Sequence, residues 1–140
     1  MPAFNKFSDF VEQVLKAKHD FSAHTFKIAL SNTAPSSANA VLADITQIAN
    51  GGGYTAGGYT LAGVTLSESG GTAKVVITDH VITASGGSIG PFQYFIIYND
   101  TATSDPLVGW YTRDAGAVTL ATGESITVDF DGTAGVFTLA

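Results

Sequence analysis

The chain lacks cysteine altogether and has little charge. Only 13% of its 140 residues are Asp, Glu, Lys or Arg, against about 25% in ordinary soluble domains. The absence of cysteine excludes disulfides, cysteine-ligated zinc and cysteine nucleophiles. Because charged residues are scarce, we expect partner molecules to cover a sizeable part of the surface. The alternative is a β-rich domain whose surface is made of Ser, Thr and Gly.

Basic residues are too few for nucleic-acid binding. The net charge is −6, and residues 28–140 carry only Lys74 and Arg113 against nine carboxylates. Phosphate neutralisation needs a basic face, which supplies most of the affinity for DNA or RNA. The sequence therefore predicts no direct contact with nucleic acid. Its acidic body could instead meet a basic patch on a protein partner.

Long apolar runs are absent as well. No run approaches the roughly 18 residues that a transmembrane helix needs. Asn5, Lys6, Ser8 and Asp9 interrupt the N-terminal phenylalanines, so no secretory signal is visible there. We expect no membrane partner, and a protein that is soluble when it is made in the cytoplasm.

The first segment is the only one with clear helical periodicity. Its apolar residues recur at three- and four-residue steps, which places them on one stripe. This pattern predicts an amphipathic helix near residues 5–18, capped at Asn5 or Ser8. We expect the stripe to pack on a sheet of the same chain; the alternative is that it reaches into a neighbouring subunit. The stripe consists of Phe4, Phe7, Val11, Val14 and Leu15.

From residue 25 onward the chain consists of apolar, often alternating runs separated by glycine turns. Such runs at intervals of about eight to twelve residues predict an antiparallel β-sandwich or barrel. We therefore expect a single domain over residues 1–140, mainly β, with one N-terminal helix. Residues 92–98 are apolar on both faces and predict a central strand, while Ser69-Gly70-Gly71 predicts a hairpin turn. The remaining expected elements are a half-buried strand at 25–30, a short helix or turn within 40–50, and strands at 60–68, 72–83, 107–111, 118–120, 125–130 and 136–139.

The sequence shows no recognisable motif for catalysis, phosphate binding or metal binding. The glycines at 51–53 and 57–58 lack the Lys-Ser/Thr pair and the helix of a phosphate loop, and no nucleophile elbow occurs. His19, His24 and His80 lack the spacing of metal ligands. The segment 129–132 looks faintly like a calcium loop, but a strand-end turn explains its Asp and Gly better. We predict no catalytic residue, no cofactor and no metal ion.

Two other kinds of site stay open. Six aromatic residues could form a sugar-stacking face, as in carbohydrate-binding β-sandwiches; the simpler interpretation is that they pack in the core and at interfaces. Three carboxylates would serve a hydrolase if the fold brought them together. The aromatic residues are Tyr54, Tyr59, Tyr94, Tyr98, Trp110 and Tyr111, and the carboxylates are Asp79, Asp100 and Asp105.

Several stretches together resemble a family of small virion proteins from tailed bacteriophages. The resemblance spans nearly the whole chain and rests on turn and strand sequences rather than on catalytic ones. Its main stretches are Gly53 to Gly58, Thr83 to Phe92, and Tyr98 to Ala102 continuing at Asp105 to Tyr111, with Phe4 to Phe7 and Val128 to Asp131 at the two ends.

This resemblance implies a capsid decoration, or cement, protein. Such a protein binds the outer surface of the assembled head and bridges major capsid protein subunits, often as a homo-oligomer, a trimer or a dimer. The resemblance also implies a protein that is not an enzyme, and it assigns no binding residue. A tail, neck or fibre component of the virion, or a receptor-binding module, is the alternative.

Overall fold

The structure is a computed structural model that describes residues 2–140, and it is mainly β. About 39% of the chain lies in strands of antiparallel sheets, with one short N-terminal helix and no closed barrel. The predicted fold class, mainly β with antiparallel strands, is confirmed. Of the two predicted forms, a sandwich or a barrel, the barrel is not adopted. No helix among residues 2–140 has both the length and the apolar character needed to cross a bilayer.

The largest sheet has five strands in the order β1-β9-β8-β2-β3. Residues 94–99 form β8, the middle strand, and all but the first of them are buried. The expectation of a central strand at 92–98 is therefore confirmed, except that the strand begins at Tyr94 because Phe92 belongs to another strand. This sheet and the segments packed directly on it are called the body. Its strands are β1 (Asn5–Lys6), β9 (Leu107–Thr112), β8 (Tyr94–Asn99), β2 (Phe26–Ser31) and β3 (Tyr59–Thr60).

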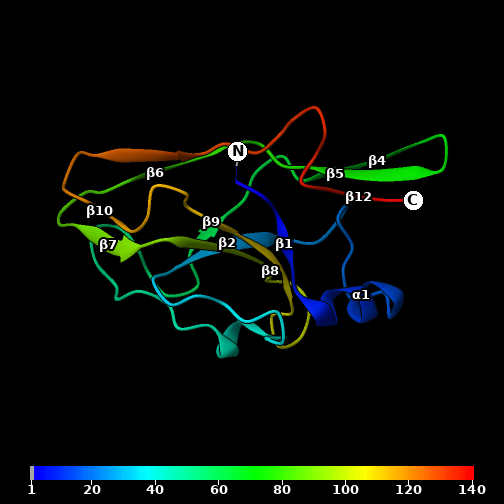
Figure 1. Cartoon of the computed structure of the whole chain (residues 1–140), viewed down its shortest axis with the longest axis horizontal. Coiled ribbons are helices and arrows are strands. Elements are labelled where there is room, and N and C mark those ends of the chain that lie inside the picture. Colours follow the sequence, from blue (N-terminus) through cyan, green and yellow to red (C-terminus); the bar gives the residue numbers. More distant parts are fainter. Residues whose placement is uncertain (1) are drawn as a thin grey trace.

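A second layer of strands lies above the five-stranded sheet in Figure 1. It contains the pair β6 and β11 and a three-stranded sheet in the order β12-β5-β4, which is called the wing. The pair β7 and β10 lies at the other end of the molecule from the wing (Figure 1). These strands are β4 (Thr65–Ser69), β5 (Thr72–Val76), β6 (His80–Thr83), β7 (Ile89–Phe92), β10 (Val118–Leu120), β11 (Ser125–Val128) and β12 (Phe137–Leu139).

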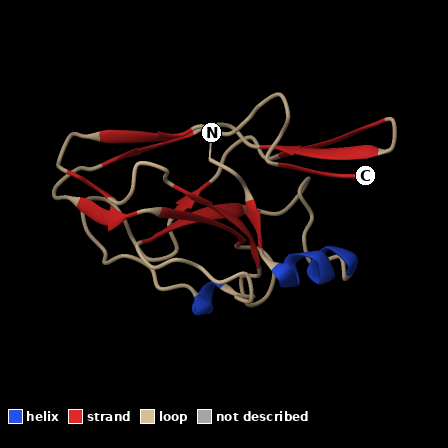
Figure 2. Cartoon of the chain, viewed as in Figure 1, coloured by secondary structure: helices blue, strands red, loops and turns tan. Residues whose placement is uncertain are grey.

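The two helical pieces lie on the opposite side from the second layer of strands (Figure 2). The helix α1 spans Ser8–Leu15, and a three-residue 3-10 helix, η1, spans Leu42–Asp44. The latter confirms the short helical turn expected within residues 40–50.

The predicted helix at 5–18 is too long at both ends. Asn5 and Lys6 instead pair with Trp110 and Gly109 as the strand β1. Their backbone groups thus find partners in the sheet, which overrides the helical periodicity of the side chains. Neither Asn5 nor Ser8 caps the helix, because Phe7 occupies the N-cap position without a side-chain hydrogen bond.

The strand β2 and the two longest predicted strands also differ from expectation. In β2 only the second residue, Lys27, is not fully buried. Both faces of β2 are covered, because Ile28 and Leu30 on one face and Ala29 on the other belong to the core. Residues 60–68 divide into β3 and β4, and residues 72–83 into β5 and β6. Each break lets the chain pass from one sheet to another.

The hairpin predicted at residues 69–71 is confirmed. Ser69 pairs with Thr72 across Gly70 and Gly71, whose φ angles are 58° and 86°. Two successive positive φ angles define the turn that matches the twist of a two-residue hairpin, and glycine adopts them without steric cost.

The N-terminal segment docks on its own sheet, as expected. Phe7 is completely buried, and its ring centroid lies 4.6 Å from that of Trp110. Trp110 is half-buried against the core, so its interpretation as a packing residue is confirmed. Gly109 leaves room for Phe4, because a Cβ at Gly109 would come within 2.3 Å of the Phe4 ring.

Candidate interaction site

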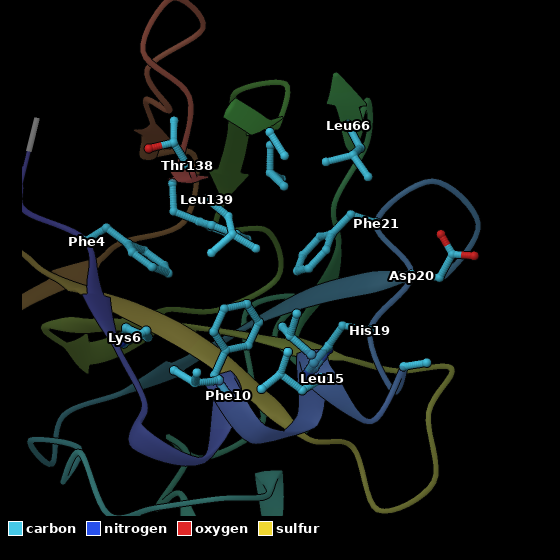
Figure 3. A pocket seen from close by; sticks show the side chains of 16 residues that line it. Phe4, Lys6, Phe10, Leu15, His19, Asp20, Phe21, Leu66, Thr138 and Leu139 are labelled. Carbon is cyan, nitrogen blue, oxygen red and sulfur yellow. The ribbon is translucent and has the colours of Figure 1, made fainter. Parts of the chain in front are cut away.

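An apolar groove separates α1 from the wing. Its volume is about 660 Å³. Figure 3 shows Phe10 and Leu15 rising from α1, and Leu66 and Leu139 of the wing facing them from above. Of the described residues that line the groove, only Lys6 and Asp20 are charged. A surface of this composition suits apolar contact rather than proton transfer or ion binding.

The alternation of the wing strands creates the upper wall of the groove. Leu66 pairs with Val75, and Val75 with Phe137. Directly paired residues share a face of an antiparallel sheet, and successive residues point to opposite faces. This row of the groove side is therefore apolar, while the next row, Ser67 and Lys74, lies on the outer side. Nearer the turn, Glu68 follows Leu139 and Ala73 on the groove side.

Aromatic rings attach the root of the wing to the body. Phe137 stacks on Phe4 with a centroid distance of 5.6 Å. Phe10 and Phe21 meet the same ring edge-on at 5.4 and 5.3 Å. Such pairs contribute about 0.5–1.5 kcal/mol each beyond the area they bury. The wing is thus fixed at β12, whereas the tip at Gly70 and Gly71 has no atom within 4 Å of an added Cβ.

Four large apolar side chains along the groove remain exposed. Leu15 is 84% exposed, Leu139 62%, Leu66 48% and Val11 46%. Single exposed apolar residues are ordinary, but several that line one concave surface mark a site for a partner. The helix stripe is thus divided, because Phe7 docks on the body while Val11 and Leu15 face the groove.

A histidine at the floor of the groove is held in its neutral form. His19 lies between the rings of Phe10 and Phe21, with centroids at 5.1 and 5.9 Å. Burial, with a smaller contribution from the nearby charge of His24, lowers the pKa of His19 to about 4. Among residues 2–140 the buried Nε2 atom of His19 has no hydrogen-bond partner, so no acceptor there would stabilise the protonated ring.

Asn99 joins this histidine to the end of the body sheet. It is fully buried, and its Nδ2 atom lies 2.9 Å from Nδ1 of His24 and 3.3 Å from Nδ1 of His19. Its Oδ1 accepts hydrogen bonds from the N–H groups of Thr101 and Ala102 at 2.9 and 3.1 Å. The cluster fixes the chain after α1 against β8 and so positions one wall of the groove.

The histidines singled out in the sequence do not converge. His19 and His24 share Asn99, whereas His80 lies against Tyr59 with a ring-centroid distance of 5.2 Å. Burial lowers the pKa of His80. Among residues 2–140 no three His, Cys, Asp or Glu side chains are grouped closely enough to hold a metal ion.

The three carboxylates considered for a hydrolase are not brought to one point. Burial, with a smaller contribution from the charge of Asp100, raises the pKa of Asp105. Asp79 instead accepts a 2.8 Å hydrogen bond from the N–H of Phe130. In the segment that resembled a calcium loop, Asp131 accepts from the N–H groups of Thr133 and Ala134 at 2.9 and 2.7 Å, which is a turn, as predicted.

The six aromatic residues do not form an exposed stacking face. Tyr54, Tyr98 and Tyr111 are at most 3% exposed, and burial raises the pKa of each of their hydroxyl groups. The Tyr54 hydroxyl donates to Gln47 and accepts from the N–H of Leu30. The others, Tyr59, Tyr94 and Trp110, are half-buried against the core.

Sequence reasoning missed the groove and the His19–Asn99–His24 cluster. The groove joins α1 to β12, more than 120 residues away in the chain, and no local pattern signals that contact. One partial signal was present, because Leu66, Val75 and Leu139 lie on alternating strands with one apolar face.

Comparison with protein-family models, curated proteins and solved structures finds no match for this chain. Its function is therefore argued from its residues and their arrangement.

Proposed function

We propose that this protein is a non-enzymatic structural component of a tailed-bacteriophage virion, which decorates the head and stabilises it by bridging major capsid protein subunits. The observation that carries the proposal is the open apolar groove between α1 and the wing. A cement protein needs a surface that binds polypeptide firmly, and the groove offers apolar walls on a rigid β scaffold. The family resemblance of the sequence supplies the identity of the partner.

The composition supports this role. Low charge and an absence of cysteine suit a protein that is assembled in a host cytoplasm and then carried on the outer surface of the particle. The net charge of −6 favours protein rather than nucleic acid as the partner. A shell repeats one attachment site many times, so an oligomer gains avidity through effective concentration. We propose a homo-oligomer, a dimer or a trimer, for this reason.

The proposal is tested on purified phage particles. Mass spectrometry should find the protein at high copy number, and a cryo-EM reconstruction should place it on the outside of the head. Absence from the particle would refute the proposal. Location in the tail or neck would refute only the cement role.

Variants of the groove connect the proposal to this surface. Leu15→Asp or Leu139→Asp should abolish binding to heads that lack the protein, because each introduces a charge into an apolar contact. The matched control is Val81→Asp, which alters a valine on β6 that is 56% exposed and does not line the groove. Equal binding by all three variants would show that the groove does not contact the shell.

A further inference from the structure

The outer edge of the wing has no partner among the described residues. The strand β4 pairs only with β5, and all five of its residues are exposed. No other edge strand in residues 2–140 is as long. Proteins commonly protect such edges with charged side chains, especially lysine, or with proline or a bulge. The strand β4 (Thr65–Ser69) has no lysine, proline or bulge, and Glu68 is its single charged residue.

The hairpin turn determines which backbone groups face outward. Ser69 and Thr72 close a two-residue turn, so they form the hydrogen-bonded pair next to it. In an antiparallel ladder the bonding direction alternates along the strand. Thr65, Ser67 and Ser69 therefore bond to β5, and the N–H and C=O groups of Leu66 and Glu68 point away from the sheet.

We propose that β4 pairs antiparallel with β4 of a second copy of this chain, about a two-fold axis at Ser67. This register overlaps the whole strand, with Thr65 opposite Ser69. It places each Leu66 opposite Glu68 of the other copy. Every outward N–H of one β4 then meets an outward C=O of the other, and the two wings become one six-stranded sheet.

The charges on β4 are compatible with this self-pairing. Glu68 is the only charged residue of the strand. In the proposed register it lies opposite a leucine, so no like charges face each other directly. Its carboxylate also accepts a 2.8 Å hydrogen bond from the N–H of Gly71, which directs it toward the turn of its own hairpin.

The pairing would also bring the groove sides of the two wings onto one face of the six-stranded sheet. Leu66, Val75 and Phe137 share one face of the wing, and the two-fold axis keeps this face on the same side in both copies. The exposed side of Leu66 is covered by the new strand. An edge contact of five residues is smaller than the roughly 1,200 Å² of a standard interface, so we expect a weak dimer in solution. The inference rests on the proposed function only in that a shell would concentrate copies and strengthen this contact.

Disulfide trapping tests the register, since the chain has no cysteine of its own. Opposed residues of an antiparallel pair have Cα atoms about 4.5–5.5 Å apart, within the range of a disulfide. Under mild oxidation Ser67→Cys should form a covalent dimer at least about tenfold faster than Leu66→Cys, whose Cα atoms would be too far apart. Thr127→Cys, on β11, is the control that gives the rate of disulfide formation by random collision. Cross-linking of Leu66→Cys but not of Ser67→Cys would overturn the proposed register.

Charge substitutions test the same contact without a cross-link. Leu66→Glu places two glutamates opposite each other at both ends of the pair, so the dimer should weaken by at least about tenfold. Leu66→Lys places a lysine opposite Glu68 and should dimerise more tightly than Leu66→Glu. The double variant Leu66→Glu/Glu68→Lys should restore dimerisation, and Val81→Glu should leave it unchanged. Analytical ultracentrifugation measures all four, with circular dichroism melting curves to show that each variant is folded.

Failure of this inference is distinguishable from failure of the proposed function. A wild-type protein that stays monomeric at several hundred micromolar, with Ser67→Cys no faster than Thr127→Cys, overturns the inference even if the protein is abundant on phage heads. A β4-mediated dimer that is absent from the particle supports the inference and refutes the proposed function.

Discussion

The strands β8 and β4 have similar lengths and opposite surroundings. Five of the six residues of β8 are buried, and β8 has a hydrogen-bonded neighbour on each side. All five residues of β4 are exposed, and one of its edges has no paired strand within residues 2–140. In the body, β8 thus has its apolar side chains buried and its backbone groups paired. In the wing, β4 has exposed side chains and unpaired backbone groups. We therefore expect stability to depend mainly on the body, and the proposed binding to use the wing and groove.

The largest expected contrast is between a buried ring of the body and an exposed leucine of the wing. Phe7→Ala should lower the free energy of unfolding by about 3–5 kcal/mol, because it removes a fully buried ring and leaves a cavity. Leu66→Ala should change it by about 0.5 kcal/mol, as at other surface sites. Urea unfolding at low protein concentration measures both. Equal losses would show that the wing is part of the stabilising core.

Two glycines with positive φ sharpen the contrast between body and wing. A Cβ at Gly58, whose φ is 77°, would lie 1.9 Å from the carbonyl oxygen of Ile28. Gly58→Ala should therefore cost about 3 kcal/mol or more. Gly70 has a φ of 58°, and no atom lies within 4 Å of a Cβ added there. Gly70→Ala should therefore cost only the backbone strain, about 1–2 kcal/mol. Thermal unfolding of the two variants checks the order, and a larger effect at Gly70 would contradict it.

A smaller effect is expected where the body meets the groove, at His19. Its pKa of about 4 in the folded protein lies below the ordinary value of 6.5, so as pH falls the unfolded chain binds the proton first. The contribution of His19 to the free energy of unfolding is therefore fully present above about pH 6.5. The free energy of unfolding should decline by about 1–2 kcal/mol as the pH approaches 4, allowing for partial screening by solvent.

Urea unfolding between pH 7 and pH 5 tests this before most carboxylates titrate. His19→Phe, which keeps an aromatic ring beside Phe10 and Phe21, should flatten the pH profile over this range. A slope unchanged by His19→Phe would mean that another group is responsible.

The sequence predicts the parts of the fold that depend on local patterns. The run at 92–98 is apolar on both faces, and its residues from Tyr94 onward form the central strand β8. The two glycines after Ser69 form the hairpin turn of the wing. The predicted helix is too long because Asn5 and Lys6 pair with β9, and that pairing links residues more than 100 positions apart. Tertiary contact here overrides a local preference.

The candidate site was beyond sequence reasoning for the same physical reason. The groove requires Phe137 to meet Phe4, Phe10 and Phe21, and nothing in the spacing of these residues specifies that contact. Leu15 and Leu66 belong to apolar patterns that usually signify burial. Only the structure shows that they remain exposed.

Amide hydrogen exchange on the free protein and on purified phage heads tests most directly whether the wing is the surface left open for partners. In dilute solution peptides from β4 should exchange rapidly and those from β8 slowly, because exchange follows local opening and hydrogen bonding. On heads, the β4 amides should become protected while β8 stays unchanged. If the protein is on the head and β4 exchanges as fast there as in solution, the wing is not the binding surface and the account is wrong.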